Sequence, residues 1–269
     1  MPDDPEILTE NPWRSLRRFT DARIGLGRVG VSLPTRELLA FQIAHAQARD
    51  AVHLPLDAGK LADDLREVEG LGDPLVLHTT AETRDDYLRN PPRGEALDAS
   101  SVAALEEAAG DPPDLALVVA DGLSSFAAQN NVAPFLRAFL GQVEGVSLSR
   151  PVIVEQGRVA IGDHVGEILK ARAVLVMIGE RPGLSSPDSL GLYFTWGPET
   201  GLHDARRNCI SNVRAAGLDY DRAAARAAWL LSEARKVETS GVALKDRSSE
   251  GEIDASDRAT SFLAAPSEG

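Results

Sequence analysis

The sequence of 269 residues has little of several residue types, and each shortage excludes a class of protein. Its single cysteine, Cys209, cannot form an internal disulfide or a cysteine-based zinc or iron–sulfur site. We therefore expect a protein of the reducing cytoplasm. No stretch approaches the roughly 18 apolar residues that a membrane span requires. The acidic first ten residues lack the apolar stretch of a secretory signal.

Positive charge is also scarce, because 28 lysines and arginines stand against 41 acidic residues, for a net charge of −13. Such a chain repels phosphate, so we expect neither nucleic acid nor an anionic membrane as a partner. A hydrophobic content of 43% is typical of a globular protein. Residues 246–269 are rich in serine and acids and have no periodic pattern. They are expected to form a disordered acidic tail.

Common catalytic motifs are missing as well. The sequence has no G-x-S-x-G, no P-loop and no pair of histidines at metal-ligand spacing. Gly25, Gly27 and Gly30 match G-x-G-x-x-G, but no clear strand precedes them. We interpret these glycines as positions of close backbone packing or of approach to a partner. The sequence predicts no catalytic residue and no metal ligand in this chain.

Apolar runs alternate with helical patterns from residue 75 onward. Continuous apolar strands of this kind are typical of a parallel sheet that is covered on both faces. The fold class is therefore α/β, with a Rossmann-like parallel sheet covered by helices over residues 75–245. A helical N-terminal segment at 11–74 and a mobile N-terminus at 1–10 are expected before it. The strands are predicted at 75–79, 115–120, 152–154, 173–178 and 192–195, and the helices at 82–89, 100–109, 124–141, 162–170 and 220–238.

Two helices are predicted in the N-terminal segment. Asn11 and Pro12 fit an N-cap followed by proline at the first helical position. The short helix that follows has apolar side chains three residues apart, with arginines between them. A second helix is expected from Pro34 to about Val52.

The segment GERPGLSSPDSLGLYFTWGPETGLHDARRNCISN, residues 179–212, differs from the rest of the chain. It holds five glycines and three prolines, so it is too interrupted to form one regular element. It is also too apolar for a solvated linker. Long irregular segments in compact domains usually shape binding surfaces, and this one is predicted to wrap a large, partly apolar ligand.

Two predicted strands end in residues that could contact a ligand. VVADGLSS, residues 118–125, fits a strand, turn and helix that present backbone N–H groups. It equally fits a glycine turn with Ser124 as N-cap. In VMIGERPG, residues 176–183, Glu180 follows the strand and could accept hydrogen bonds from amides or hydroxyls. The alternative is an ion pair between Glu180 and adjacent loop residues such as Arg181.

Cys209 follows two arginines, and such cations lower a thiol pKa. A catalytic thiol would also need a base, for which His203 is the local candidate. We favour a buried small residue, or one that touches a ligand.

Several longer strings resemble one family. LRRFTDARIGLGR, LAFQIAHAQARDAV, VADGLSS, VEQGRVAIGDHVGEIL, IGERPGLSSPDSLGLYFTW and ARRNCISNVR look like the small subunit of ethanolamine ammonia-lyase. The likeness extends from about Asn11 to Lys245, and IGERPGLSSPDSLG and RNCISN are highly specific.

The resemblance implies a cofactor, a partner and three site residues. Family enzymes convert ethanolamine to acetaldehyde and ammonia by radical chemistry with adenosylcobalamin. A large TIM-barrel subunit holds the substrate, and the small subunit binds the cofactor from the other side. The cofactor-contacting positions carry over to Val159 in QGRVAIGD, Glu180 in IGERPG and Cys209 in RNCISN. A corrin, with its apolar face and amide rim, suits glycine-rich backbone, small apolar residues and one carboxylate acceptor.

Three further expectations concern the limits of this resemblance. His164 lacks the D-x-H-x-x-G spacing of cobalt-binding histidines, so it is expected not to bind cobalt. Some family members reside in a bacterial microcompartment through an N-terminal amphipathic extension. Only about ten residues precede Asn11 here, and they are acidic and contain proline, which leaves encapsulation open. The rival interpretations are a nicotinamide- or nucleotide-dependent enzyme that acts alone and a structural subunit without cofactor contact.

Overall fold

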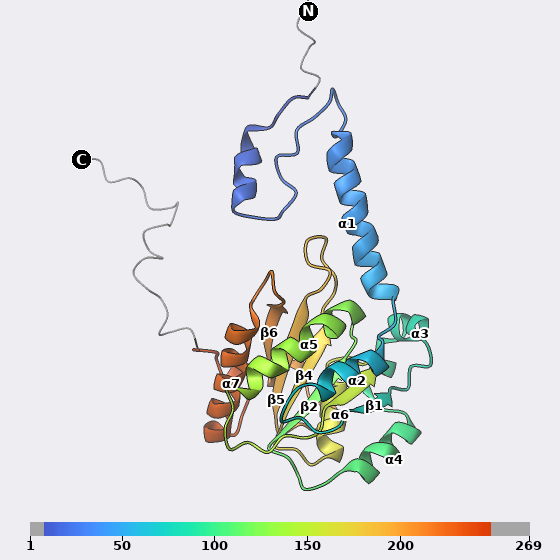
Figure 1. Cartoon of the computed structure of the whole chain (residues 1–269), viewed down its shortest axis with the longest axis vertical. Helices are drawn as coiled ribbons and strands as arrows, with labels where there is room; N and C mark the ends of the chain where they lie inside the picture. The colour runs from blue at the N-terminus through green and yellow to red at the C-terminus, as the bar shows by residue number, and fades with distance from the viewer. Residues whose placement is uncertain (1–7, 249–269) are drawn as a thin grey trace, which may run out of the picture.

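The structure, a computed structural model, describes residues 8–248 (Figure 1). Most of the expected mobile N-terminus and nearly all of the expected acidic tail lie outside the described residues, at 1–7 and 249–269.

Six strands form one sheet in the order β1-β3-β2-β4-β5-β6. The four strands β1, β3, β2 and β4 run parallel, and β5 and β6 are antiparallel to their neighbours. The α/β class is therefore confirmed. The strands span Leu75–His78 (β1), Leu115–Ala120 (β2), Val152–Glu155 (β3), Ala173–Gly179 (β4), Leu190–Trp196 (β5) and Arg207–Val213 (β6).

The prediction of a wholly parallel sheet was wrong for the last two strands. Only residues 180–189 join β4 to β5, and only 197–206 join β5 to β6. A parallel return needs a crossover of a dozen or more residues, usually a helix, so the chain turns back antiparallel. The strand order also differs from the 3-2-1-4-5-6 of the dinucleotide-binding fold.

Helices cover both faces of the sheet (Figure 1). α2, α5 and α7 pack on one face, and α4 and α6 pack on the other. The α-helices span Thr35–His53 (α1), Ala58–Arg66 (α2), Arg84–Arg89 (α3), Ala99–Ala108 (α4), Ser125–Leu140 (α5), Ile161–Ile168 (α6) and Tyr220–Val237 (α7). Short 3₁₀ helices span Pro12–Arg18 (η1), Pro91–Glu95 (η2), Asp204–Arg206 (η3) and Gly241–Ala243 (η4).

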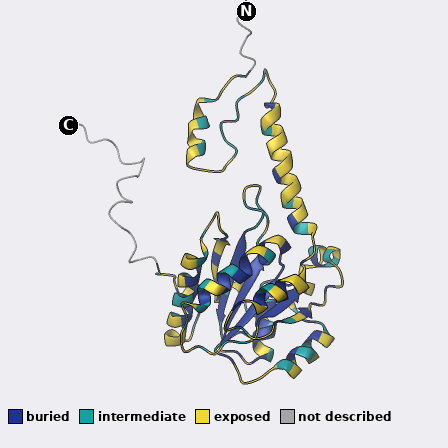
Figure 2. Cartoon of the chain, in the orientation of Figure 1, coloured by how far each residue is buried: buried dark blue, intermediate teal, exposed yellow. Residues whose placement is uncertain are grey.

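The two central strands are buried along their whole length, which explains their unbroken apolar sequences (Figure 2). Successive side chains of a strand point to opposite faces. Leu117 and Val119 of β2 accordingly join the core under α5 and α7, whereas Val118 and Ala120 join the core under α6.

Side-chain caps fix where the helices begin. The Ser124 hydroxyl accepts a hydrogen bond from the N–H of Ala127 at 3.2 Å, so the alternative interpretation of VADGLSS as a capped glycine turn is confirmed. Asn11 likewise accepts the N–H of Trp13 at 2.9 Å, although the helix it caps is a 3₁₀ helix.

The N-terminal segment stands away from the sheet (Figure 1). We call residues 11–34 the arm; it contains η1 and connects to α1. Gly25 has a φ of +58°, and a Cβ there would lie 2.6 Å from the backbone nitrogen of Arg14. The interpretation of the first glycine of G-x-G-x-x-G as a point of close backbone packing is therefore confirmed.

A crevice between β2 and β3 follows from the connections of these neighbouring strands. β2 leads into α5 on one face, and β3 leads into α6 on the other. In open α/β sheets, ligands bind outside the carboxyl ends of strands at such a switch point.

Candidate functional site

A cavity of about 400 Å³ lies at this switch point. Segments that follow β2, β3 and β4 contribute to its wall, so one cavity collects residues far apart in the sequence. Val159 and Glu180, two of the three predicted site residues, both line it. The complete lining is Tyr87, Gly122, Leu123, Arg158, Val159, Ile178, Gly179, Glu180, Arg181 and Tyr193.

Two side chains hold the turn that carries Val159 by hydrogen bonds to the N–H and the carbonyl of Gly157. The N–H of Gly157 donates to the Asp121 carboxylate at 3.2 Å, and the Tyr87 hydroxyl donates to the carbonyl of Gly157 at 3.1 Å. The N–H of Arg158 donates to the carbonyl of Gly94 at 2.7 Å. Val159 is therefore presented by a fixed turn.

Tyr87 forms part of the cavity wall between two cations. The guanidinium of Arg158 lies 4.2 Å from its ring centroid, and that of Arg84 lies 4.9 Å away. Burial raises the pKa of the Tyr87 hydroxyl, which stays protonated and able to donate to Gly157. Cation–π contacts of this kind stiffen the wall through attraction to the ring face.

Asp121 lies behind the cavity, directly after β2. Its carboxylate receives Nη1 of Arg84 at 2.8 Å, and both side chains are largely buried. Nε of Arg84 donates to the carbonyl of Val52 at 2.8 Å, which connects the end of α1 to this pair. Burial raises the pKa of Asp121 to about 6, against the lowering by Arg84 and backbone N–H groups.

Two described residues donate hydrogen bonds to the Glu180 carboxylate, and both bonds go to its Oε2 atom. The Ser189 hydroxyl donates one, and the N–H of Asn212 donates the other at 3.2 Å. No ion pair joins Glu180 to Arg181 within residues 8–248, so that alternative was wrong. Gly191 leaves room for this side chain, because a Cβ there would lie 3.1 Å from Oε1 of Glu180.

Cys209 lies beside the cavity and does not line it. It is an exposed residue of β6 and pairs with Tyr193 of β5, which does line the cavity. Burial raises the pKa of the Tyr193 hydroxyl, and the neighbouring Cys209 and Glu180 raise it further. The Cys209 sulfur lies 3.3 Å from the Ser211 hydroxyl. The interpretation of Cys209 as a buried residue was therefore wrong, and its contact with a ligand stays a prediction. Through Tyr193, Cys209 is level with Val176 in the middle of β4, whereas Val159 and Glu180 lie at the carboxyl ends of strands.

The segment 179–212 is more regular than expected. It contains all of β5, the 3₁₀ helix η3 and most of β6, so only 180–189 and 197–203 are irregular. The strand at Arg207–Val213 was missed because its burial does not alternate: Arg207, Ile210 and Val213 are the buried positions. Irregular backbone after β4 still contributes Glu180 and Arg181 to the cavity.

His164 has a structural contact. Its Nδ1 accepts the N–H of Leu97 at 3.0 Å, which connects α6 to the segment before α4. That His164 does not bind cobalt stays a prediction. Among the described residues, no group of three or more histidine, cysteine or acidic side chains could hold a metal ion.

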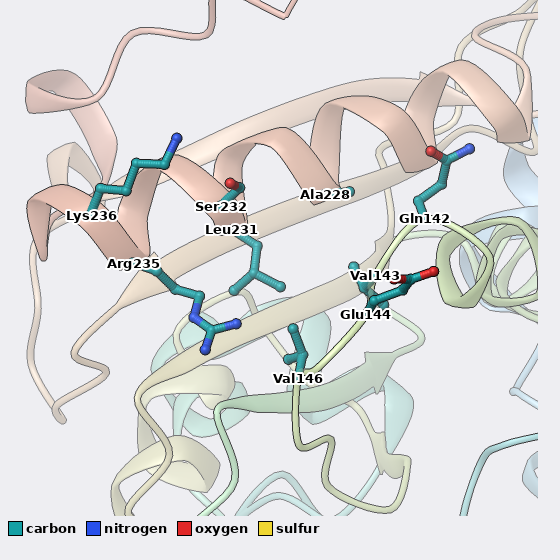
Figure 3. Close-up of a pocket in the computed structure, with 9 residues that line it drawn as sticks. All are labelled: Gln142, Val143, Glu144, Val146, Ala228, Leu231, Ser232, Arg235 and Lys236. Carbon is teal, nitrogen blue, oxygen red and sulfur yellow. The ribbon is translucent and has the colours of Figure 1, made fainter.

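A second cavity, of about 370 Å³, lies between α7 and residues 142–146 (Figure 3). Those residues lead to the bridge between Leu148 and Leu115, at the start of β2. This cavity is therefore at the amino ends of the parallel strands, where open α/β sheets do not usually bind ligands. The cavity with Val159 and Glu180 is the better candidate.

Four important site residues were not predicted. Tyr87, Arg158 and Tyr193 line the cavity, and Asp121 holds the turn beneath it. Only Asp121 carried a sequence signal, because it directly follows a buried strand. Tyr87, Arg158 and Tyr193 come from elements that lie far apart in the sequence and are brought together by the strand order of the sheet.

A helix-covered α/β sheet with a cavity at its switch point has the arrangement at which open α/β sheets commonly bind ligands. The family model described as "Ethanolamine ammonia-lyase light chain (EutC)" matches residues 10–245. The chain is 57% identical over 247 residues to the ethanolamine ammonia-lyase small subunit of Pseudomonas paraeruginosa, covering 90% of each. It is 54% identical over 249 residues to the same subunit of Ralstonia nicotianae, covering 91% of this chain and 92% of the relative.

The chain belongs to the ethanolamine ammonia-lyase light chain family and is thus a subunit of a lyase. Within residues 8–248, every helix is too short or too polar to cross a bilayer.

Proposed function

We propose that this chain binds adenosylcobalamin at the switch-point cavity and holds it against a larger, TIM-barrel subunit that carries the ethanolamine. The complex would convert ethanolamine to acetaldehyde and ammonia by a radical mechanism. The observation that carries the proposal is that Val159 and Glu180 line one cavity and that Cys209 pairs with a third wall residue, Tyr193.

The wall of the cavity suits a corrin. Gly122 and Gly179 offer bare backbone, and Leu123, Val159 and Ile178 offer apolar contact. Burying about 200 Å² of apolar cofactor surface would contribute roughly 5 kcal/mol before ordering costs. Oε1 of Glu180 accepts no hydrogen bond from the described residues, so it is available to an amide of the cofactor rim.

The cavity is too small for the whole cofactor. Pockets of about 300–1,000 Å³ enclose drug-sized ligands, and a corrin with its amide side chains is considerably larger. A cavity of about 400 Å³ therefore holds one edge or face, and another surface must cover the rest. This supports a site shared between two subunits.

In this proposal the residues of this chain bind and orient the cofactor. When bound, adenosylcobalamin supplies the radical by breaking its cobalt–carbon bond. Val159 would pack against the corrin, Glu180 would accept from an amide at its rim, and Cys209 would contact its outer part. No residue of this chain is assigned a proton transfer.

The test is the cofactor affinity of the reconstituted complex with Glu180→Ala. Loss of the acceptor is expected to raise the Kd of adenosylcobalamin about tenfold, or about 1.4 kcal/mol, with little change in kcat. Glu144→Ala is the matched control, because Glu144 lines the cavity at the opposite end of the sheet (Figure 3). Equal affinity for both variants would contradict the role of Glu180.

A further inference from the structure

The arm differs from the rest of the chain in its charge. Residues 11–34 hold five arginines and one aspartate, a net charge of +4, and Arg36 at the start of α1 adds a sixth arginine; the residues outside 11–36 carry −18. Arg17 is satisfied internally by a two-pronged ion pair with Glu37. Arg18, Arg28 and Arg36 are exposed, and no carboxylate of residues 8–248 lies within ion-pair distance of them.

Much of the arm and of α1 is exposed (Figure 2), and the exposed residues include large apolar ones. In the arm, Trp13 is 67% exposed and Phe19 is 73% exposed. In α1, only Ala44 and Ala51 are buried. Its large apolar residues spread over roughly 200° of the helix circumference at 100° per residue. They are Leu38, Leu39, Phe41 and Ile43, and all are exposed.

A helix with this composition does not suit an isolated position in water. α1 has 19 residues, and helices of that length depend on packing for much of their stability. Apolar residues around most of a helix are typical of one covered on several sides. The rest of the chain covers α1 at its C-terminal end, where the Ser125 hydroxyl donates to the carbonyl of Leu54 at 2.7 Å.

The arm lies on the same side of the molecule as the switch-point cavity. The loop after Glu180 extends toward the arm (Figure 1) and meets it through two long hydrogen bonds. Arg23 donates to the carbonyl of Leu184 at 3.4 Å, and Ser185 donates to the carbonyl of Asp21 at 3.5 Å. A protein that covers the cavity would therefore lie next to the arm.

We propose that the arm and α1 form the docking surface for the larger subunit, with Arg18, Arg28 and Arg36 facing carboxylates of that subunit. The proposal rests on the proposed function, because it takes the larger subunit as the cover of the cavity. The apolar side chains of α1 would be buried in the contact. The positive arm of an otherwise acidic chain would steer and orient docking.

A second copy of this chain is the competing occupant, since its acidic body also complements the arm. The larger subunit is favoured because the arm borders a half-open cavity that needs a cover. The relatives are also named as small subunits, which implies a larger partner.

The test measures affinity between the full chain and the larger subunit without cofactor, by sedimentation velocity at two salt concentrations. Arg28→Glu/Arg36→Glu should weaken association at least tenfold at low salt, and less at high salt. The matched control is Arg150→Glu/Arg235→Glu, which makes the same charge change at exposed arginines near the amino ends of the strands. A second variant, Leu39→Ser/Ile43→Ser, should weaken association with little dependence on salt. Its control is Val237→Ser/Val242→Ser.

Three results would overturn the docking proposal. They are unchanged association in both Arg28→Glu/Arg36→Glu and Leu39→Ser/Ile43→Ser, an equal loss of association in the control variants, or a loss of self-association alone. Adenosylcobalamin binding is then measured on whatever complex forms. Normal association of the arginine and α1 variants, together with lost cofactor binding in Glu180→Ala, would refute the docking surface and leave the cofactor site intact. Weakened association of the arginine and α1 variants, together with unchanged cofactor binding in Glu180→Ala, would support the docking surface and refute the role of Glu180 in the cofactor site.

Discussion

Arg207 holds Asp163 through two hydrogen bonds, of 2.6 and 2.8 Å, and both side chains are almost fully buried. The pair joins β6 to α6. Cys209 lies two residues after Arg207, and Val159 lies four residues before Asp163. One buried ion pair thus fixes the spacing between two proposed cofactor contacts.

Asp163→Asn should therefore lower the free energy of unfolding by about 3 kcal/mol, because it leaves the buried Arg207 charge with only the exposed Asp204 as its counter-ion. Urea denaturation measures this change. Asp85→Asn, which breaks the exposed pair with Arg89, is the control and should cost less than about 1 kcal/mol. A similar small loss in both variants would show that the buried pair contributes little.

Asp121 gives the protein a pH dependence whose sign can be worked out. Its pKa is raised to about 6 in the folded protein, above its ordinary value of 3.8. Between these two values, the folded state binds a proton that the unfolded state has lost. The contribution of Asp121 to stability is thus fully present below pH 3.8 and decreases as pH rises through 6.

The stability difference between the wild type and Asp121→Asn should decrease by about 1 kcal/mol between pH 5 and pH 6. Urea denaturation of both proteins at each pH isolates this group from the other titrating groups. A constant difference over this range would mean that Arg84 outweighs burial and keeps the carboxyl ionised.

Gly191→Ala tests how closely Glu180 is held. An added Cβ would lie 3.1 Å from Cγ and Oε1 of Glu180 and from Cε2 of Tyr193. The Glu180 side chain should shift, and the adenosylcobalamin affinity of the complex should fall several-fold. Stability should change by only about 1 kcal/mol, since overpacking is offset by the preference of strands for alanine over glycine.

Gly110→Ala is the control, because its added Cβ has no heavy atom of residues 8–248 within 4 Å beyond its own chain neighbours. Its affinity should equal that of the wild type. Unchanged cofactor affinity in Gly191→Ala would indicate that the position of Glu180 is unimportant for binding.

Local sequence signals predicted the elements that depend on neighbouring residues. The strand at Leu115–Ala120 and the cap at Ser124 follow from an unbroken apolar run and from a hydroxyl before a helical pattern. The positions of Val159 and Glu180 came from family resemblance, and the structure places both in one cavity.

Contacts between distant residues could not be predicted in this way. The pairs Arg84–Asp121 and Arg207–Asp163 join residues 37 and 44 positions apart. They depend on strand order and on the antiparallel return of β5 and β6. The sequence carries the strand direction in its loop lengths, because the connections 180–189 and 197–206 are too short for parallel crossovers.

The most direct test of a shared cofactor site is a titration of adenosylcobalamin, followed by visible absorption, into this chain, the larger subunit and their mixture. The mixture should bind the cofactor at least tenfold more tightly than either subunit alone. Equally tight binding by the larger subunit alone would contradict the claim that this chain supplies half of the site.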